Sequence, residues 1–545
     1  MLKTELKALA PLCTEEHVAL DYPALPEARC ENVHPVGRPS LEQQAFLSVH
    51  QTLEPSAILR ADPEPLSVDT MVQRAVQAQH DFQGWPEARI DQLLQALAER
   101  VSRHAEELAL AAVQETRLGN VADKTAKNRF ASLDVCRSLV GQVGHGRLRW
   151  DKRKKITTFA SPVGVVFGLV PATNPTSTFI FKVLVCLKGR NAVILSPSQR
   201  ALGVSNQLGE LIQAVLREQG APPDLVQWIR SKNSRTTTLP FMEHPDIALI
   251  LATGGPALVK AAYRSGTPAI GVGAGNAPAL ICADANLKQA AACVVRSKSF
   301  DNGIICCSEH NLVVVQSCAH AFRAALEQQG AAVLSAEETA AFLRLMVDPA
   351  SHRLRPHVLG QCAADLAAQV GIQRSYPIQL LVVPTEAVSE NNPLAREKLA
   401  PILSLLTVAD EQVGMHVCQK LLALDGLGHT AIIHTRSTAL VETFAARMPA
   451  SRILVNAPGT QAGIGMTSGL MPSLTLGCGT FGGTSTTDNV TYSHLLNVKR
   501  VAYGTTPKRL SVADGKSALL RPDLLLKAGA TLVWHRIQRR TRSSS

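Results

Sequence analysis

The chain has 545 residues, about three to four times the length of a typical domain, which excludes a peptide or a single small module. Hydrophobic residues make up 46% and charged residues 18% of the chain, and this globular composition excludes wholesale disorder. The formal net charge of +11 suits anionic ligands such as nucleotides, but it does not separate them from nucleic acid.

Cysteine usage and hydropathy indicate the cellular setting. The chain contains 12 cysteines without a CxxC spacing, which predicts reduced thiols and neither disulfides nor a metal site. It has no uninterrupted apolar run of about 18 residues and no long apolar segment near the N-terminus. We therefore expect a cytoplasmic protein without a membrane partner.

The two ends of the chain differ from its body. Residues 1–64 carry ten acidic against five basic residues and several prolines, which predicts a poorly ordered N-terminal extension. Residues 504–545 carry nine basic against two acidic residues, which predicts a basic C-terminal tail.

Between these ends the pattern predicts an α/β protein. Apolar residues recur at helical spacing from Val72 to about residue 116, a further helix is expected over 122–142, and residues 146–160 alternate in the manner of an exposed ribbon. Short apolar runs predict strands at 163–170, 192–195, 246–252, 279–282, 311–316, 378–384 and 452–455. Helices fit between most of them, for example at 177–188, 202–219 and 256–264. Apolar strands separated by helices indicate parallel sheets covered on both faces.

Two glycine-containing segments are candidates for phosphate binding. Gly477, Gly479 and Gly482 satisfy GxGxxG, but the following TSTTDN is no helix, so a glycine-rich loop is expected there. In the second segment, an apolar strand leads into Thr253, Gly254 and Gly255 before Pro256. Small residues at a helix start let a phosphate approach free backbone N–H groups, although an ordinary strand, turn and helix has the same pattern.

Two further segments are candidates for the chemical step. Cys306 and Cys307 in FDNGIICCSEH (300–310) are either buried thiols or include a thiolate nucleophile in an exposed turn. Asn174 in PATNPTST (171–178) is either a turn former or a side-chain donor to a developing oxyanion. The residues alone leave both pairs of interpretations open.

Together these segments resemble the aldehyde dehydrogenase superfamily, in particular its branch that acylates coenzyme A, over residues 70–503. The resemblance is strongest to the aldehyde dehydrogenase half of bifunctional aldehyde-alcohol dehydrogenases and to relatives acting on acetaldehyde, sulfoacetaldehyde or succinate semialdehyde. The matching stretches are ETRLGNVADKTAKNRFAS (115–132), VPATNPTSTFIFK (170–182), LILATGGPALVKAAYRSGTPAIGVGAGNAP (249–278), SKSFDNGIICCSEH (297–310), EKLAPILS (397–404), GLGHT (426–430) and PSLTLGCGTFGG (472–483).

The resemblance implies roles for individual residues. It makes Cys306 the nucleophile and Cys307 a bystander, with Asn174 and the backbone N–H of Cys306 as oxyanion donors. His429 matches the histidine of the GxGHT motif, for which a structural and a functional role are both open. The residues implied to bind the cofactor NAD, or alternatively NADP, are Thr173, Ser196, Thr253, Gly254, Gly255 and Glu397.

Two departures from the wider superfamily qualify this assignment. Hydrolytic members carry a glutamate where this chain has Val272, and valine cannot take a proton from water; the resemblance therefore implies coenzyme A as acyl acceptor. The usual lysine for the adenosine ribose is replaced by Ser196 and Pro197, so recognition of the ribose is unconventional.

The resemblance also implies an architecture of two doubly wound parallel-sheet domains and a β-flap that makes a homo-oligomer. The expected division is a cofactor-binding domain over 65–284 interrupted by the ribbon 144–160, a catalytic domain over 285–483 and a flap segment over 484–503. The terminal extensions are expected to serve targeting or docking, for instance to the protein shell of a bacterial microcompartment. The alternatives are a hydrolytic aldehyde dehydrogenase and, from another class, a non-catalytic scaffold or nucleic-acid binder suggested by the basic tail.

Overall fold

The computed structural model describes residues 66–231, 235–386 and 388–505. The expected N-terminal extension 1–64 and nearly all of the basic tail lie outside these ranges. The described residues fall into two compact units, of which the larger holds 66–144 and 162–496 and the smaller holds 145–161 and 497–505. No helix among the described residues is long and apolar enough to cross a membrane.

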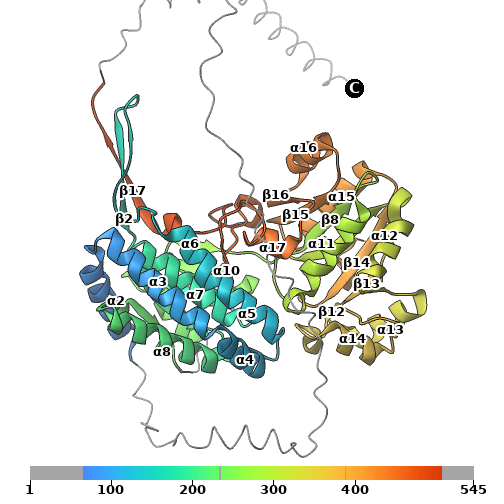
Figure 1. Cartoon of the computed structure of the whole chain (residues 1–545), viewed down its shortest axis with the longest axis horizontal. Helices are drawn as coiled ribbons and strands as arrows, with labels where there is room; N and C mark the ends of the chain where they lie inside the picture. The colour runs from blue at the N-terminus through green and yellow to red at the C-terminus, as the bar shows by residue number, and fades with distance from the viewer. Residues whose placement is uncertain (1–65, 232–234, 387, 506–545) are drawn as a thin grey trace, which may run out of the picture. The chain divides into compact units, whose positions relative to one another are not determined.

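The first half of the larger unit contains a parallel five-stranded sheet in the order β5-β4-β3-β6-β7. Its strands are β3 (Val165–Val170), β4 (Ala192–Pro197), β5 (Val226–Trp228), β6 (Ile247–Ala252) and β7 (Ala269–Gly271). Its helices are α2 (Val68–Gln83), α3 (Glu87–Arg103), α4 (Ala105–Thr116), α5 (Val121–Arg129), α6 (Val135–Leu139), α7 (Pro175–Lys188), α8 (Leu202–Glu218), α9 (Arg235–Glu243) and α10 (Pro256–Arg264) (Figure 1).

Helix α7 is the centre of this half, because all its 14 residues are buried. Pro175 occupies its first turn, where the missing N–H costs nothing. Its buried Lys182 donates from Nζ to the carbonyl oxygens of Leu169 in β3 (2.5 Å) and Leu251 in β6 (2.7 Å). The chain runs outward from β3 through β4 to β5 and returns to β6 on the other side of β3, so the gap between β3 and β6 is the topological switch point where ligands bind in such sheets.

The second half of the larger unit contains a seven-stranded sheet in the order β10-β13-β14-β9-β8-β15-β16, with parallel neighbours. Its strands are β8 (Ala277–Ile281), β9 (Glu309–Val315), β10 (Ala331–Val333), β13 (Leu380–Pro384), β14 (Ile402–Val408), β15 (Gly428–His434) and β16 (Ala450–Val455). Its helices are α11 (Leu287–Ser299), α12 (Gln316–Gln328), α13 (Ala336–Met346), α14 (Ala363–Val370), α15 (Glu411–Leu424), α16 (Thr438–Arg447) and α17 (Gly459–Gly463). A short pair, β11 (Val347–Asp348) and β12 (Arg353–Leu354), lies apart from it.

The smaller unit is centred on a three-stranded sheet in the order β1-β2-β17. Its strands are β1 (Gly146–Asp151), β2 (Ile156–Pro162) and β17 (Leu496–Ala502), of which β1 and β2 are antiparallel. The Trp150 and Tyr503 rings meet edge to face, with centroids 5.7 Å apart. The expected ribbon at 146–160 is thus confirmed. The smaller unit carries five exposed large apolar side chains, Leu148 and Trp150 of β1, Val498 and Val501 of β17, and Tyr503 just after β17.

Two expected boundaries are displaced. Strand β8 pairs with β9 and β15, so the seven-stranded sheet begins before residue 284, because the apolar run at 277–281 is central to that sheet. Residues 484–495 belong to the larger unit and the flap strand starts only at Leu496. Side-chain bonds hold this stretch there, including those from Asn489 Nδ2 to the carbonyl oxygens of Gly463 (3.0 Å) and Met471 (2.9 Å).

The two sheets confirm the predicted fold class and every strand predicted from an apolar run. The run at 163–170 forms β3, the run at 311–316 forms β9, and GxGxxG at 477–482 is a loop with a short 3₁₀ turn. The short strands β5, β7, β10, β11 and β12 were not predicted, and neither were β14 and β15. Polar residues such as Ser404 interrupt their apolar character, and the sheet accommodates Ser404 by its bond to Asn311 Oδ1 (2.5 Å).

Candidate active site

Cys306 lies where the amino ends of three adjacent strands meet. Cys306 lies three residues before the start of β9, and Gly275 lies two residues before the start of β8. His429 is the second residue of β15. A Cβ at position 275 would lie 1.8 Å from the carbonyl oxygen of Cys306. Only glycine therefore permits this close backbone approach, which holds the Cys306 turn against the segment before β8.

The thiol of Cys306 contacts the imidazole of His429, with Sγ 3.2 Å from Nε2. The other ring nitrogen, Nδ1, lies 2.9 Å from Thr430 Oγ1. Arg452 donates from Nε to the same hydroxyl oxygen (3.3 Å) and from Nη2 to the carbonyl oxygen of His429 (2.8 Å). The Thr430 oxygen can accept from both Arg452 and Nδ1–H, and that tautomer leaves the Nε2 lone pair facing the thiol.

Burial sets the charge states of this pair. Desolvation raises the pKa of Cys306 well above that of a free cysteine, with smaller contributions from Cys307 and Glu397, while Arg452 opposes the rise. Desolvation also lowers the pKa of His429 well below its usual value, and the positive charge of Arg452 lowers it further. The resting pair is a neutral thiol and a neutral imidazole, and thiolate forms only when the proton leaves Cys306.

Cys307 has a different environment. It is fully buried, and its Sγ lies 3.6 Å from the carbonyl oxygen of Thr460. A Cβ on Gly463 would come within 2.8 Å of that sulfur, so no room remains beside Cys307 for an acyl group. Cys306 is the partly exposed member of the pair.

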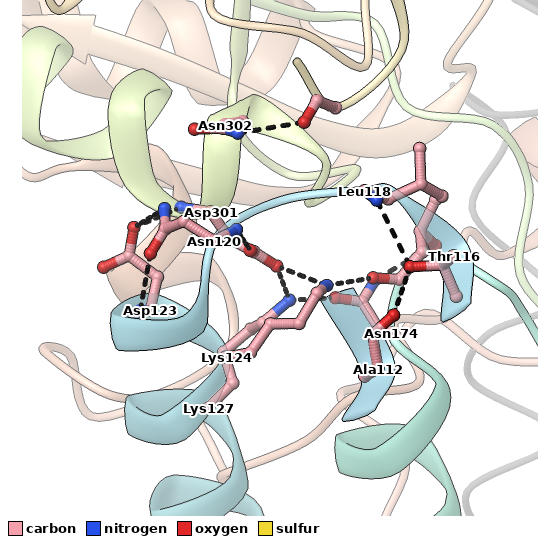
Figure 2. A network of polar contacts seen from close by, with 12 residues as sticks. Ala112, Thr116, Leu118, Asn120, Asp123, Lys124, Lys127, Asn174, Asp301 and Asn302 are labelled. Carbon is pink, nitrogen blue, oxygen red and sulfur yellow. Dashed lines mark hydrogen bonds and ion pairs between the residues drawn. The ribbon is translucent and has the colours of Figure 1, made fainter. Parts of the chain in front are cut away.

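Asn174 is presented from the other sheet, between the carboxyl end of β3 and the first turn of α7. Lys127 of α5 donates from Nζ to Asn174 Oδ1 (2.5 Å), and Asn174 Nδ2 donates to Thr173 Oγ1 (3.2 Å). Lys124, one turn earlier in α5, donates to the carbonyl oxygen of Thr173 (3.1 Å). The asparagine side chain is thus held from two sides by α5 and its own neighbour (Figure 2).

The buried carboxylate of Asp301 joins this network to the cysteine segment. Both Lys124 and Lys127 form ion pairs with its Oδ2, and the Asn120 N–H donates to its Oδ1 (2.9 Å) (Figure 2). Burial alone would raise the pKa of Asp301, but the two ammonium groups outweigh it and hold the pKa below its usual value. Asp301 also has a left-handed backbone (φ 47°), five residues before Cys306, which is a strained conformation for a residue other than glycine.

The candidate cofactor residues lie at the carboxyl ends of adjacent strands. Thr173 lies three residues after β3, Ser196 is the second-to-last residue of β4, and Thr253 directly follows β6. After Thr253 the helix α10 begins, and nothing lies within 4 Å of a Cβ built on Gly255. The free N–H groups at this helix start and the open space before them fit an anionic group such as a pyrophosphate.

Glu397 lies instead on the side of the cysteine. Its Oε1 accepts the Gly275 N–H (2.9 Å), which ties it to the segment that packs behind Cys306. Burial raises the pKa of Glu397 to about 7, although the Gly275 N–H opposes the shift. Val272, at the start of the same segment, is buried, and its N–H donates to the carbonyl oxygen of Ala252 (3.1 Å).

A second buried carboxylate, Glu309, begins β9. Its Oε1 accepts the N–H of Gly459 (2.8 Å), and its Oε2 has no hydrogen-bond partner among the described residues. Burial raises the pKa of Glu309 to about 7, opposed by the hydroxyl of Ser297 and by backbone N–H groups. The strand that follows Cys306 therefore begins with a carboxyl group whose pKa lies near neutral pH.

Sequence reasoning did not single out Lys127, Asp301 or Arg452. The two lysines of DKTAKN lie three residues apart, so they share a helix face, and FDNG places an acid in an otherwise apolar stretch. Charged residues embedded in buried segments were the available signal, but their mutual pairing depends on the tertiary fold.

Comparisons with known proteins agree on one family. Residues 58–492 match the model of the aldehyde dehydrogenase family. The bifunctional aldehyde-alcohol dehydrogenase AdhE of Escherichia coli (strain K12) is 39% identical over 440 residues, which cover 80% of this chain and 49% of that protein. The sulfoacetaldehyde dehydrogenase (acylating) of Cupriavidus necator is 37% identical over 456 residues, which cover 82% of this chain and 92% of that protein.

A solved structure has the same fold. The crystal structure of an acetylating aldehyde dehydrogenase from Geobacillus thermoglucosidasius matches with a TM-score of 0.78 and 40% identity, covering 81% of this chain and 98% of that chain. This chain spans about half the length of the bifunctional relative.

The first prediction concerns the two cysteines. Cys306→Ala should abolish turnover, because it removes the thiol beside His429, whereas Cys307→Ala should retain most of it. Intact-mass spectrometry after incubation with aldehyde and oxidised cofactor should find one acyl group per chain in wild type and in Cys307→Ala. An acyl adduct mapped by peptide digestion to Cys307 would contradict this assignment.

The second prediction concerns Glu309 and pH. Its pKa is about 7 when folded, above the ordinary value of 4.5, so the folded protein binds more protons between these values and loses stability as the pH rises through them. Glu309→Gln should remove this loss, on the order of a few kcal/mol at about 1.4 kcal/mol per pKa unit. Urea unfolding at pH 5 and pH 8 measures it, and part of the slope should remain through Glu397.

The matched control for this experiment is Glu338→Gln. The side chain of Arg374 lowers the pKa of Glu338, so its stabilising contribution is lost only as the pH falls below about 4.5, and the slope between pH 5 and pH 8 should not change. An unchanged slope in Glu309→Gln itself would show that Glu309 is ionised throughout this range.

Proposed function

Because the chain belongs to the aldehyde dehydrogenase family, we propose that it oxidises a short-chain aldehyde to an acyl-CoA thioester, using a nicotinamide cofactor and coenzyme A. The observation that carries this proposal is the contact between Cys306 Sγ and His429 Nε2 at 3.2 Å. The segment before β8, which packs behind Cys306, begins with Val272 and not with a carboxylate. A nucleophile with an adjacent proton acceptor can form a covalent acyl intermediate.

In the first half-reaction, the proton of Cys306 passes to His429 Nε2 and the sulfur bonds to the aldehyde carbon. The carbonyl oxygen becomes an oxyanion, which accepts hydrogen bonds from Asn174 Nδ2 and from the Cys306 N–H. A nicotinamide held near Thr173, Ser196, Thr253 and Glu397 would supply the acceptor for the hydride of that carbon. The carbonyl then re-forms as a thioester on Cys306, and His429 releases its proton to solvent.

In the second half-reaction, the thiol of coenzyme A gives its proton to His429 and its sulfur attacks the thioester carbon. The bond to Cys306 breaks, acyl-CoA leaves, and the proton on His429 returns to the Cys306 thiolate. The positive charge of Arg452 disfavours a lasting imidazolium and favours thiolate, so His429 suits brief proton transfer in both halves. All steps are reversible, and acyl-CoA reduction follows the same path backwards.

Coenzyme A is favoured over water as the acyl acceptor. Water attacks a thioester slowly unless a base removes its proton, and Val272 supplies none. The carboxyl group of Glu397 lies near Cys306, but its Oε1 accepts the Gly275 N–H. A thiol with a pKa of about 8.5 gives its proton to His429 far more readily than water does, because it is already partly ionised at neutral pH.

The side chains around Cys306 favour an alkyl aldehyde such as acetaldehyde over sulfoacetaldehyde or succinate semialdehyde. Cys306 packs on a cluster of apolar side chains. The cluster consists of Phe130, Phe300, Ile305, Cys307, Ile464, Met466, Leu474 and Leu476. An anionic tail would lose its hydration against this surface without a compensating partner within the cluster.

We propose NAD as the cofactor. The carboxyl end of β4 and the next residue, Ser196–Ser198, carry no cation for a 2′-phosphate. The next cation, Arg200, donates from Nη2 to the carbonyl oxygen of Thr116 (3.1 Å). The exposed apolar side chains of the flap, Leu148, Trp150, Val498, Val501 and Tyr503, support a homo-oligomer in which a second copy covers them.

The third prediction tests the acyl acceptor. Without coenzyme A, wild type should release about one NADH per site and then nearly stop; with coenzyme A it should turn over steadily and form acyl-CoA. A panel of alkyl, sulfonated and carboxylated aldehydes, each with NAD or NADP, identifies the preferred pair. Steady turnover to free acid without coenzyme A would show that the enzyme is hydrolytic.

The matched variant for this test is Val272→Glu. A carboxylate there should restore slow release of free acid, because general-base assistance is typically worth roughly 10²–10⁴-fold. Val272→Leu, which changes size without adding a base, should keep the burst and the stop.

The fourth prediction concerns His429. His429→Gln should lower kcat by about 10²–10⁴-fold at neutral pH, the typical range for loss of a general base, and rising pH should recover activity as Cys306 ionises directly. The control is His434→Gln, which removes another buried histidine of β15 whose pKa burial lowers to about 4. Equal kcat losses in both variants would assign His429 a structural role.

A further inference from the structure

We propose that Lys127 is a positioning residue, which turns the amide of Asn174 so that its nitrogen, and not its oxygen, is offered to the substrate oxygen. This inference rests on the proposed function, in which Asn174 stabilises an oxyanion. The ion pair of Lys127 and Asp301 would then orient the Asn174 amide in addition to neutralising a buried charge.

The argument begins with the ambiguity of an asparagine side chain. Its oxygen accepts and its nitrogen donates, and a half-turn of the amide exchanges them. Only the nitrogen stabilises an oxyanion, and the oxygen in the same place would repel it. A device that selects one of the two orientations is therefore needed for Asn174 to act.

Lys127 meets this requirement. An ammonium group has three donors and no acceptor, so the Asn174 atom that it contacts at 2.5 Å is the oxygen, Oδ1. One N–H of Asn174 goes to Thr173 Oγ1 at 3.2 Å, and within the described residues the other has no protein acceptor. The half-turned amide would place N–H groups against the ammonium, which is repulsive (Figure 2).

Asp301 keeps Lys127 protonated, which is the form that fixes the orientation of the Asn174 amide. Burial lowers the pKa of Lys127 to about 8, and the charge of Asp301 is the main opposing influence. Lys127 therefore remains mostly an ammonium at neutral pH. The side chain has almost no freedom either, because it is fully buried between Asp301 and Asn174.

Asp301 also holds the segment before β9, which carries the second proposed donor, the Cys306 N–H. Asp301 is bound through its side chain by the Asn120 N–H and through its own N–H by Asp123 Oδ2 (2.7 Å). Its left-handed backbone turns the chain toward Cys306. One buried charge thus ties the amide donor on the five-stranded sheet to the cysteine segment of the seven-stranded sheet.

The test is a double-mutant cycle on kcat with saturating aldehyde, NAD and coenzyme A. Asn174→Ala should lower kcat by about 10²–10³-fold, as loss of one oxyanion donor does. Lys127→Met should lower it by about 10²-fold, as a misplaced group does. The double variant should be no worse than Asn174→Ala alone, because Lys127 has nothing left to position. Losses that multiply in the double variant would overturn the proposal.

Two variants separate positioning from charge balance. Lys124→Met removes the other cation from Asp301 but leaves Asn174 Oδ1 bound, and it should reduce kcat less than Lys127→Met. Lys127→Arg keeps a donor and a charge and should recover most of the lost kcat. A loss in Lys124→Met equal to that in Lys127→Met would show that neutralisation of Asp301 is what matters.

Further measurements keep the outcomes distinct. The rate of Cys306 alkylation by iodoacetamide should be similar in wild type and Lys127→Met, because the thiol pairs with His429. If Lys127→Met does not fold, as thermal melting would show, the cycle is run with Lys127→Arg, whose smaller loss should also vanish in the Asn174→Ala background. Full activity of Asn174→Ala would instead refute the oxyanion role in the proposed function.

Discussion

The buried charge of Asp301 is the interaction on which the rest of the site depends. A carboxylate without water is costly, and the ammonium groups of Lys124 and Lys127 together with the Asn120 N–H compensate it. Removing Asp301 would leave two buried ammonium groups without the carboxylate that they contact. The segment before Cys306 is thereby fixed to a helix that belongs to the other sheet, and the strained backbone at Asp301 is held in place.

This constraint explains how residues from two sheets meet at the candidate site. The five-stranded sheet presents the carboxyl ends of β3 and β6, where free N–H groups and small residues suit an anionic cofactor. The seven-stranded sheet presents the amino ends of β8, β9 and β15, where Gly275 allows backbone contact behind the thiol. In the proposed reaction each sheet contributes one group of residues, so the placement of the two sheets matters as much as any single side chain.

The electrostatic environment of Cys306 keeps its thiol protonated at rest and allows a thiolate only while a proton acceptor is available. Burial raises the pKa of Cys306 and lowers that of His429, so the resting pair is neutral and the thiol is protected from adventitious reaction. Arg452 shifts both groups in the direction that favours thiolate and disfavours imidazolium. A nucleophile that ionises only as its proton is taken is suited to a substrate and a thiol acceptor that enter in turn.

The sequence by itself determined the alternation of strands and helices, the family resemblance, and the roles proposed for Cys306, Asn174 and Thr253, because these rest on local periodicity and on short motifs. The tertiary structure decided what lies beside them. The partner of Cys306 is 123 residues away, and Lys127 and Asp301 are separated by 174 residues. Periodicity reports which residues are buried, but it does not report which buried groups meet. That depends on strand order and on where the two sheets join, as the placement of β8 beyond the expected boundary illustrates.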